Sequence, residues 1–390
     1  MEDKISAIVT DAHLRYSRVV VQSLGTKGIS ITASGEKDRP NKTFYSKYCK
    51  NRIIYPAPDE NEELFVKTMM RAAKGHEVLI PMHERTIIPI SKHLKEFERI
   101  LKVPIPEYKI LKIALDKAET VKAAQRIGIP TPQTHFPNNL HELESLSKNL
   151  NYPVVVKIRR EIFTPPPRYT YAYSQKDLIY KYRLMHEKCA YPLIQELIHG
   201  VGYGFFTLFN KHHKPISIFC HRRIREYPIT GGPSTYCEST YNQKIVQYGL
   251  KLLKEIKWYG VAMVEFRLDH SDNKFKLMEI NPRFWGSLPL AIASGVDFPY
   301  LLYQMATGDD TKPQITYKIG VRCRFLDSDF LALIEALRLS DHEITYLWNF
   351  IKSFNDKNVV YGDFSMKDFG PNAYMFAHAL MSIARKFKTC

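Results

Sequence analysis

Two neighbouring runs of residues carry the alternating pattern of β-strands, and each holds acidic side chains among apolar ones. The first run is Gly260–Asp269, with Glu265, and the second begins at Lys276 and holds Glu279 and Asn281. Successive side chains of a strand point to opposite faces, so Glu279 and Asn281 share one face of the second run. If the runs form a hairpin, two carboxylates and one amide oxygen converge.

This set of oxygen ligands favours a hard metal ion. Mg²⁺ prefers a few carboxylates with waters and substrate phosphates to an all-protein cage, and the set contains no Cys or His. The alternative is a hairpin that merely exposes two acids to water. The sequence argues against this exposed hairpin, because Glu279 stands in an apolar run with Leu277 and Ile280. Leu277 is expected on the same face as Glu279, and an unpaired charge among apolar side chains is costly. Arg283, just after Pro282, adds a bidentate cation suited to phosphate.

Length and cysteine usage set the outer bounds. A chain of 390 residues exceeds what one hydrophobic core serves, so two or three domains are expected. No apolar run is long enough to cross a bilayer, and the first residues lack the features of a signal peptide, which favours a cytoplasmic protein. The six cysteines are scattered without a C-x-x-C pair, so neither a disulfide framework nor a zinc site is expected.

The net charge of +16 favours anionic partners, which include nucleotides, nucleic acids, acidic metabolites and membrane surfaces. Basic residues are dispersed along the chain, and no zinc finger, basic-region helix or RNA-recognition motif is present. We therefore expect no specific nucleic acid as the main ligand.

The first hundred residues alternate between strands and helices. Apolar segments at 5–10, 28–32 and 77–81 have strand character, and helices are expected at 15–24 and 60–74. This rhythm is typical of a doubly wound fold with a parallel sheet. Because the segment contains no G-x-G-x-x-G, no dinucleotide site is expected there.

Two lysines stand where an anion would be favoured. The clearest helix begins after Asp116, a good N-cap, and stops at Gly128, so Lys117 lies at the positive end of the helix dipole. Lys157 stands near the end of an apolar strand at 151–158, where a lysine either reaches water or meets an anion. The alternative for each is an ordinary solvated lysine.

A further apolar strand at 191–200 leads into a glycine-rich run. Gly200, Gly202 and Gly204 alternate with larger residues and would let the backbone approach a planar ligand closely. A plain turn between two strands shows similar glycines, so both interpretations stay open.

In order and spacing, these segments resemble the motif series of the ATP-grasp superfamily over about residues 105–310. The series comprises Asp116–Lys117, Val154–Lys157, Gln195–Ile198, Glu265 and Glu279-x-Asn281-x-Arg283. The resemblance implies an α/β and α+β architecture, with a doubly wound N-terminal domain and two ATP-grasp subdomains that hold ATP between them. The implied domains are the N-terminal domain 1–104, the small subdomain 105–195, the subdomain with the metal site 196–318 and a helical C-terminal extension 319–390.

The resemblance also implies which residues bind the nucleotide. Lys117 and Lys157 would bind the phosphates of ATP. The adenine hinge would consist of Gln195, Glu196, Leu197 and Ile198, with Glu196 near the adenine or the ribose.

The metal end of the site follows from the same resemblance. Glu265, Glu279 and Asn281 would hold one or two Mg²⁺ or Mn²⁺ ions that bridge the phosphates, which neutralises and aligns the transferring phosphoryl group. Arg283 would stabilise that group or an acylphosphate.

The segment 219–239 resembles part of an uncharacterised subgroup of ATP-grasp carboxylate–amine ligases, in which a basic strand leads into a Gly-Gly-Pro-Ser loop. Alternation puts His221, Arg223 and Arg225 on one face, a cradle for a carboxylate or the γ-phosphate, so Arg223 and Arg225 are candidate catalytic residues. The alternative is a solvated edge strand guarded by charge.

One loop departs from the family pattern. Many members follow the strand lysine with a glycine-rich phosphate lid, whereas here Lys157 is followed by a proline-rich loop at 163–168. Proline supplies no N–H, so this loop cannot hold phosphate with successive backbone donors. Arg159, Arg160 or Arg168 would have to replace them.

The last 70 residues lie outside the resemblance. Segments 329–339 and 344–354 are expected to be helical, and 372–388 reads as an amphipathic helix with a basic end. Such an end is suited to weak contact with an anionic membrane, and the alternative is a terminal helix docked on its own core.

The motifs and the resemblance together predict an ATP- and Mg²⁺-dependent ligase that activates a small carboxylate as an acylphosphate and joins it to an amine or a similar nucleophile, releasing ADP and phosphate. The alternatives are an ATP-binding scaffold or regulator that has lost ligation and, as a third hypothesis, a nucleic-acid-binding protein. Dimers are common in the superfamily, which leaves a homodimer open. The acid and the amine are not identified by the sequence.

Overall fold

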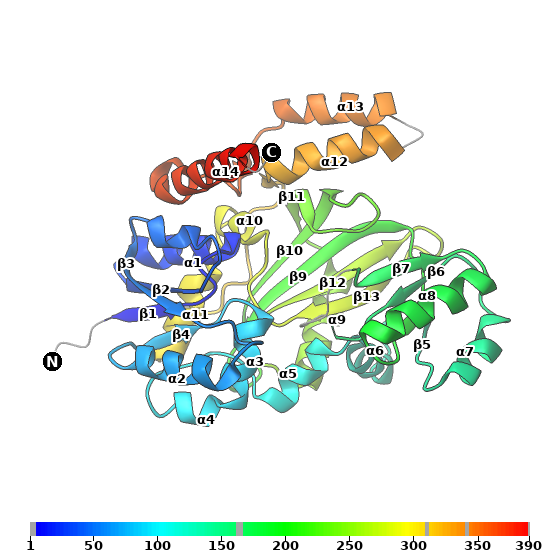
Figure 1. Cartoon of the computed structure of the whole chain (residues 1–390), viewed down its shortest axis with the longest axis horizontal. Helices are drawn as coiled ribbons and strands as arrows, with labels where there is room; N and C mark the ends of the chain where they lie inside the picture. The colour runs from blue at the N-terminus through cyan, green and yellow to red at the C-terminus, as the bar shows by residue number, and fades with distance from the viewer. Residues whose placement is uncertain (1–4, 161–166, 309–311, 340–342, 389–390) are drawn as a thin grey trace.

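Three β-sheets organise the chain (Figure 1). The computed structural model describes residues 5–160, 167–308, 312–339 and 343–388. In this part of the chain, one seven-stranded sheet lies between two sheets of four strands. The α/β and α+β architecture predicted from the sequence is confirmed.

The N-terminal sheet is parallel throughout and has the order β3-β2-β1-β4. Its strands are β1 (Ser6–Val9), β2 (Ser30–Glu36), β3 (Cys49–Tyr55) and β4 (Val78–Ile80). The helices of this unit are α1 (Arg15–Thr26), η1 (Lys42–Tyr45), α2 (Glu62–Ala73), α3 (Glu84–Lys92) and α4 (Leu94–Phe97). The three expected strands and two expected helices are present, and β3 is an addition.

The small sheet has the order β5-β8-β6-β7 and is antiparallel. It consists of β5 (Thr134–His135), β6 (Val154–Lys157), β7 (Tyr169–Ala172) and β8 (Leu193–Glu196), with α7 (Leu140–Ser147) and α8 (Gln175–Lys188). A separate apolar cluster, which includes Leu143, Val156 and Tyr182, joins these helices to the sheet.

The large sheet has the order β13-β12-β9-β10-β11-β14-β15. Its strands are β9 (Gly200–Phe209), β10 (Pro215–Glu226), β11 (Ser234–Thr240), β12 (Gly260–Asp269), β13 (Phe275–Asn281), β14 (Arg322–Arg324) and β15 (Val359–Tyr361). Alternation along β12 divides the core: Ala262 and Val264 belong to one apolar cluster, while Val261 and Met263 belong to the other.

Helices cover both faces of this sheet. The face of Val264 packs on α5 (Tyr108–Leu115), α6 (Lys117–Arg126) and α9 (Gln243–Glu255). The face of Met263 packs on α10 (Leu288–Ala293), α11 (Phe298–Thr307) and the N-terminal unit. Of the described helices, none is both long enough and apolar enough to span a bilayer.

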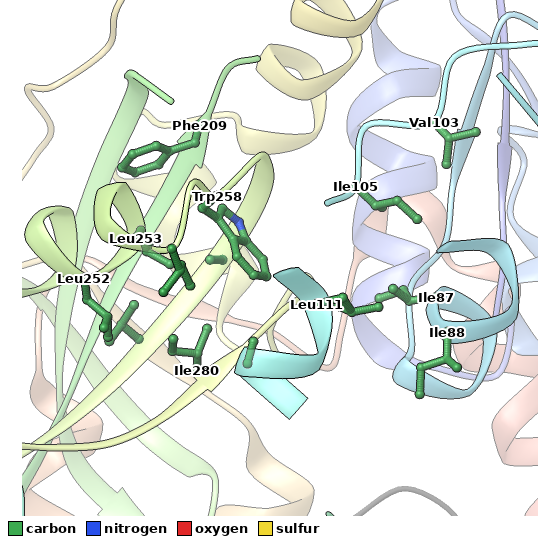
Figure 2. Packing of buried hydrophobic residues seen from close by; sticks show 14 of the residues in the cluster. Ile87, Ile88, Val103, Ile105, Leu111, Phe209, Leu252, Leu253, Trp258 and Ile280 are labelled. Atoms are coloured by element: carbon green, nitrogen blue, oxygen red, sulfur yellow. The ribbon is translucent and has the colours of Figure 1, made fainter. Parts of the chain in front are cut away.

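One apolar cluster runs from the N-terminal unit into the large sheet. Figure 2 shows Leu111 of α5 beside Ile87 of α3, with Ile280 and Trp258 of the large-sheet unit on the other side of α5. The core is therefore continuous across the predicted boundary between residues 104 and 105. Helices α5 and α6 also pack on β13, although the prediction groups them with the small sheet.

The C-terminal segment is not purely helical, which corrects the prediction for 319–390. Strands β14 and β15 extend the large sheet, because β14 pairs with β11 and β15 pairs with β14. The remaining elements are α12 (Leu326–Leu339), α13 (Glu343–Lys352), η2 (Ser353–Asn355), η3 (Met366–Asp368) and α14 (Gly370–Lys388). Tyr374 of α14 stacks on Tyr45 of η1 with 4.2 Å between ring centroids, so this helix is docked on the N-terminal unit.

A buried ion pair joins α12 to the large sheet. Arg225 of β10 donates from Nη2 to Oδ2 of Asp329 at 2.6 Å and from Nε to Oδ1 at 2.8 Å. Thr235 donates to the same carboxylate at 2.8 Å, and Arg324 lies 3.5 Å from it. All four residues are buried, so the Asp329 carboxylate and the two guanidinium groups must neutralise one another without help from water.

We expect Asp329→Ala to lower the free energy of unfolding by about 3–5 kcal/mol, because it leaves two guanidinium groups buried without their carboxylate. Glu62→Ala, which removes a half-exposed ion pair with Lys92, serves as the control and should cost about 1 kcal/mol or less. Urea denaturation followed by circular dichroism measures both. Equal losses in the two variants would contradict the anchoring role of Asp329.

Candidate active site

A cavity of about 740 Å³ opens beside the large sheet and the small sheet. Side chains of both sheets line it, together with helix α1 and the loop between β10 and β11. It brings together most of the predicted site residues: Lys117, Lys157, Glu196, Leu197, Ile198, Arg223, Glu265, Glu279, Asn281 and Arg283.

The two acidic residues lie directly opposite each other. Glu265 of β12 pairs with Glu279 of β13 on one side and with Gly204 of β9 on the other, and Gly204 pairs with His221 of β10. These four residues form one row across four strands. The convergence expected from alternation is therefore observed.

The face predicted for Leu277 is wrong because β13 contains a bulge. Glu265 pairs with Glu279, but its neighbour Phe266 pairs with Leu277, which leaves Met278 as an extra residue. Leu277 consequently lies in the apolar core with Phe266. The bulge lets an apolar run of sequence present Glu279 to the cavity.

Lys117 holds one of the two carboxylates. Its Nζ donates to Oε2 of Glu279 at 2.5 Å, and Asn281 donates from Nδ2 to Oε1 of Glu279 at 3.0 Å. Burial opposes ionisation of Glu279, but the Lys117 charge and these two hydrogen bonds outweigh burial and lower its pKa to about 2. Glu279 is thus an anion at the start of helix α6, where Asp116 caps the helix by accepting from Ala118 N at 2.9 Å.

Arg223 holds the other carboxylate by reaching across strand β9. Its Nη2 donates to Oε2 of Glu265 at 2.6 Å, and its Nη1 donates to Glu226 at 3.1 Å. The path is open because Gly202 has no side chain: a Cβ there would lie 2.7 Å from Cδ of Arg223. Burial nevertheless raises the pKa of Glu265, and the charge of Glu279 adds to this while Arg223 opposes it.

The glycines of β9 therefore make room for side chains of β10. A Cβ on Gly204 would lie 2.9 Å from Nε2 of His221, just as one on Gly202 would meet Arg223. The backbone at Gly200 has no room for a ligand either, because a Cβ there would collide with the carbonyl oxygen of Leu268. The structure thus favours the interpretation that these glycines make room for Arg223 and His221 over the interpretation that they let a planar ligand approach the backbone.

Arg225 does not share the face of Arg223, which corrects the prediction of three basic groups on one face. A register shift in β10 sets Arg223 opposite Cys237 and Arg225 opposite Tyr236. Cys237 and Tyr236 are neighbours on β11 and point to opposite faces, so Arg225 turns away from the cavity. It binds Asp329 instead, and it does not line the cavity.

His221 lines the cavity as a neutral group. Burial, and then the charge of Arg223, lower its pKa to about 3. Its Nδ1 lies 3.2 Å from Oγ of Ser287, while its Nε2 has no hydrogen-bond partner among the described residues. His221 is therefore neutral and adds no positive charge to the site. Its ring can still donate or accept a hydrogen bond.

The residues of the predicted hinge join the small sheet to the large one. Gln195 is buried, and its side chain accepts from Nζ of Lys157 at 2.8 Å and donates to Thr134 at 3.0 Å. Glu196 accepts from Nζ of Lys276 at 2.8 Å and from the backbone N–H of Gln133. These side chains thus shape the hinge, and Leu197 and Ile198 line the cavity beside them.

Arg283 connects the metal end of the cavity to the N-terminal unit. Its Nε donates to Oε1 of Glu84 at 2.6 Å, and its Nη2 donates to Oδ1 of Asn281 at 3.2 Å. Its guanidinium also lies 5.6 Å from the ring centroid of Tyr16. Burial opposes the charge of Arg283, but Glu84 outweighs burial and raises its pKa.

The proline-rich loop lies partly outside the described residues, since 161–166 are not among them. Arg168 lines the cavity. Arg159 and Arg160 bind the Asp116 carboxylate, each at 3.1 Å. Tyr171 of β7 donates to the carbonyl oxygen of Thr230, which directly precedes the Gly-Gly-Pro-Ser loop, at 3.1 Å.

Several residues of the cavity were not predicted. Tyr16, Trp285, Ser287, Tyr169, Tyr171 and Arg267 line it, and Glu84 holds Arg283. Trp285 and Ser287 follow Arg283 closely in sequence, so their positions gave a signal. The others come from separate elements, and no local pattern links them to the site.

Comparison with known proteins identifies a family model and several relatives that resemble this chain. A family model described as "ATP-grasp in the biosynthetic pathway with Ter operon" matches residues 220–327. The chain is 23% identical over 191 residues to the formate-dependent phosphoribosylglycinamide formyltransferase of Sulfurisphaera tokodaii, covering 46% of this chain and 47% of that protein. It is 27% identical over 185 residues to the D-alanine--D-alanine ligase of Carboxydothermus hydrogenoformans, covering 43% of this chain and 59% of the ligase.

A solved structure shows the same fold. The biotin carboxylase–β-γ-ATP complex from Campylobacter jejuni superposes with a TM-score of 0.67 at 16% identity, covering 82% of this chain and 74% of that chain. The chain is thus similar to ATP-grasp proteins in sequence and shares their fold. It spans about half of the length of the two sequence relatives above, so its own reaction is a matter for proposal.

The acidic pair fits the divalent cation that an ATP-grasp fold implies. Burial raises the pKa of Glu265 and the charge of Glu279 adds to this, and a bound cation would relieve both effects. In the described ranges, no group of three or more His, Cys, Asp or Glu side chains could hold a metal. Two carboxylates completed by water and phosphate oxygens suit Mg²⁺. Asn281 turns its Nδ2 toward both carboxylates, and exchanging its amide atoms would present oxygen instead.

We expect Gly202→Ala to weaken this ATP-grasp site, because the added Cβ would displace Arg223 from Glu265. Leaving Glu265 without its buried cation should reduce Mg²⁺-dependent nucleotide binding by about tenfold or more, since a charged hydrogen bond contributes about 1.5–3 kcal/mol. Gly286→Ala is the control, because a Cβ there meets nothing within 4 Å. Titration with a fluorescent ATP analogue measures both, and unchanged affinity in Gly202→Ala would contradict the role of the glycine.

Proposed function

We propose that the protein is an ATP- and Mg²⁺-dependent ligase that activates a small carboxylate as an acylphosphate and joins it to an amine. The observation that carries this proposal is the facing pair Glu265 and Glu279, held by Arg223 and Lys117 in one cavity. Two half-buried carboxylates side by side are costly, and a site in which a metal–nucleotide takes over from these cations accounts for them. The names of the relatives, which include a D-alanine--D-alanine ligase, support this reaction class.

Each group of residues has a part in the proposed binding of ATP. Leu197 and Ile198 would receive the adenine at the junction of the two sheets, and Lys157 and Lys117 would bind the phosphates. Glu265 and Glu279 would hold one or two Mg²⁺ ions, whose contribution when bound is to neutralise the phosphate charge.

The proposed chemistry has two steps. In the first, a carboxylate oxygen of the acid forms a bond to the γ-phosphorus of ATP while the bond from that phosphorus to the bridging oxygen breaks, releasing ADP. In the second, the amine nitrogen bonds to the acyl carbon, phosphate leaves with its electron pair, and the nitrogen loses a proton. Arg283 would bind the transferring phosphoryl group, where it acts most strongly on the transition state.

The scaffold hypothesis makes a different prediction for the same site. An ATP-binding regulator would use Lys117, Lys157 and the hinge without turning ATP over. The proline-rich segment 163–168 motivates this alternative, since it replaces a glycine-rich lid. The nucleic-acid hypothesis has no support in the cavity, which is concave and lined by both signs of charge.

We expect the wild-type protein to release ADP when Mg-ATP is combined with the correct pair from a panel of amino acids and small carboxylates. Glu279→Gln should reduce this release at least about 100-fold, because it removes a metal ligand and the partner of Lys117. Glu187→Gln, on helix α8 and away from the cavity, is the matched control. A coupled ADP assay with mass spectrometry of products makes the measurement. Saturable ATP binding without substrate-stimulated release for any member would favour the scaffold.

We expect Arg283→Lys to lower kcat about 10- to 1,000-fold and to change the KM for ATP far less. Lysine can keep the charge that compensates Glu84 but cannot make the bidentate contacts of a guanidinium. Steady-state kinetics on the best substrate pair separates the two parameters. A rise in KM with unchanged kcat would place Arg283 in ATP binding instead of phosphoryl transfer.

A further inference from the structure

Helices α12 and α13 turn an apolar face outward. Figure 1 shows the two helices side by side at the outer edge of the molecule, beyond β11, and the rings of Phe330 and Phe350 join them with 5.5 Å between centroids. The large apolar side chains of this face are 37–83% exposed and are called the outer stripe: Phe330, Leu331, Ile334, Leu337, Ile344, Leu347, Trp348 and Ile351.

The outer stripe has the spacing of a contact between helices. On α13, Ile344, Leu347, Trp348 and Ile351 stand at positions i, i+3, i+4 and i+7, which places them on one side of the helix. The stripe residues of α12 include a similar series: Phe330, Ile334 and Leu337. A surface helix normally turns such a stripe toward the core, whereas Ile344 is 83% exposed and Trp348 is 64% exposed. The residues that the structure describes therefore leave this face open to water.

The inner side of the helix pair is already engaged. Asp329 and Ala332 of α12 are buried, as is Phe350 of α13. Glu335 of α12 also accepts from the backbone N–H of Ile229 at 2.7 Å. Turning the outer stripe inward would break the buried ion pair of Asp329 and this hydrogen bond, so the stripe stays available to a partner.

The stripe is large enough for a stable interface. Its eight side chains are about half exposed and present roughly 700 Å² of apolar surface, with ~150–200 Å² for each complete side chain. The largest apolar patch of a typical monomer covers ~300–600 Å², and a standard interface buries ~800 Å² per partner. The stripe and the polar residues at its rim together reach that area. Trp348 adds an aromatic anchor of the kind that dominates binding.

Charge distinguishes between the candidate partners. Helices α12 and α13 carry four acidic and two basic residues, a net charge of −2, in a chain whose net charge is +16. A helix that lies on an anionic membrane needs a polar face rich in Lys and Arg, which these two helices do not have. Two copies of a basic chain repel each other least where such a face is the contact. Arg338 of α12 and Glu343 of α13 also offer one charge of each sign to a second copy.

We propose that the outer stripe is the interface of a homodimer, in which the α12–α13 pairs of two copies pack face to face as a four-helix bundle. An apolar face is complementary to itself, so a two-fold contact needs only this one surface, and two-fold dimers are the commonest assemblies of soluble proteins. Helices with this spacing of apolar residues pack in such bundles. The dimer goes beyond the proposed ligase reaction and does not depend on it.

Sedimentation velocity of the full chain over a series of concentrations tests the proposal. We expect a dimer of twice the chain mass of 45.4 kDa, with a Kd in the micromolar range or below. Because the contact is apolar, raising the salt concentration from about 0.1 M to about 1 M should not dissociate the dimer. A monomer at every concentration up to ~100 µM would overturn the proposal.

Variants locate the interface. Trp348→Glu and Ile344→Glu should each weaken dimerisation at least about 100-fold, because each would bury a charge in the apolar contact. Phe376→Glu is the matched control: Phe376 is 69% exposed on α14, outside the stripe, and its variant should dimerise like the wild type. All three side chains are exposed in one copy, so the variants should keep the wild-type circular dichroism spectrum. Unchanged dimers in both stripe variants, or equal dissociation in Phe376→Glu, would contradict the assignment.

Flotation with vesicles of phosphatidylcholine and phosphatidylserine tests a lipid surface as the other occupant. We expect no vesicle binding that depends on Trp348, because the stripe is covered in the dimer and its helices are net acidic. Vesicle binding by a monomer that Trp348→Glu abolishes would assign the stripe to a membrane and overturn the dimer.

Discussion

The pairing of Glu265 with Glu279 across β12 and β13 is the constraint on which the rest of the site depends. Two adjacent carboxylates with little solvent exposure repel each other, and each is held by a cation from another part of the fold. Lys117 arrives from the start of α6, and Arg223 arrives from β10 by crossing β9. The start of α6 and the strand β10 are thus each tied to the acidic pair by one ion pair.

The glycines of β9 show how the sheet meets this constraint. Strand β9 lies between β10 and β12, and a side chain on β9 would normally keep side chains of β10 and β12 apart. Gly202 leaves the gap through which Arg223 passes, and Gly204 leaves room for the His221 ring. The two glycines thereby leave room for a cation and a neutral imidazole beside the acids, which gives the cavity two distinct kinds of hydrogen-bonding group.

Local pattern predicted much of the fold and of the metal end of the site. The N-terminal parallel sheet, the hairpin β12–β13 and the Asp116 cap of α6 all depend on residues close in sequence, and the structure contains them. Strand β3 was missed because it is an edge strand with mostly exposed residues, which lacks the apolar run of the others. The errors at Leu277 and Arg225 share one cause: a bulge adds one residue to a strand, and strict alternation then assigns every residue beyond it to the wrong face.

Local sequence patterns could not predict contacts between segments that are far apart in the chain. Glu84 meets Arg283 although 199 positions separate them, and Arg225 meets Asp329 across 104 positions. Both pairs join the catalytic body to a flanking unit, the first to the N-terminal sheet and the second to the C-terminal helices. Arg283 and Arg223 lie in the cavity, while Arg225, two residues beyond Arg223, holds α12. One strand therefore carries both a residue of the cavity and the residue that anchors α12, two positions apart. The C-terminal segment is therefore anchored to the same strand that holds Glu265 through Arg223, so the acidic pair and α12 share one support.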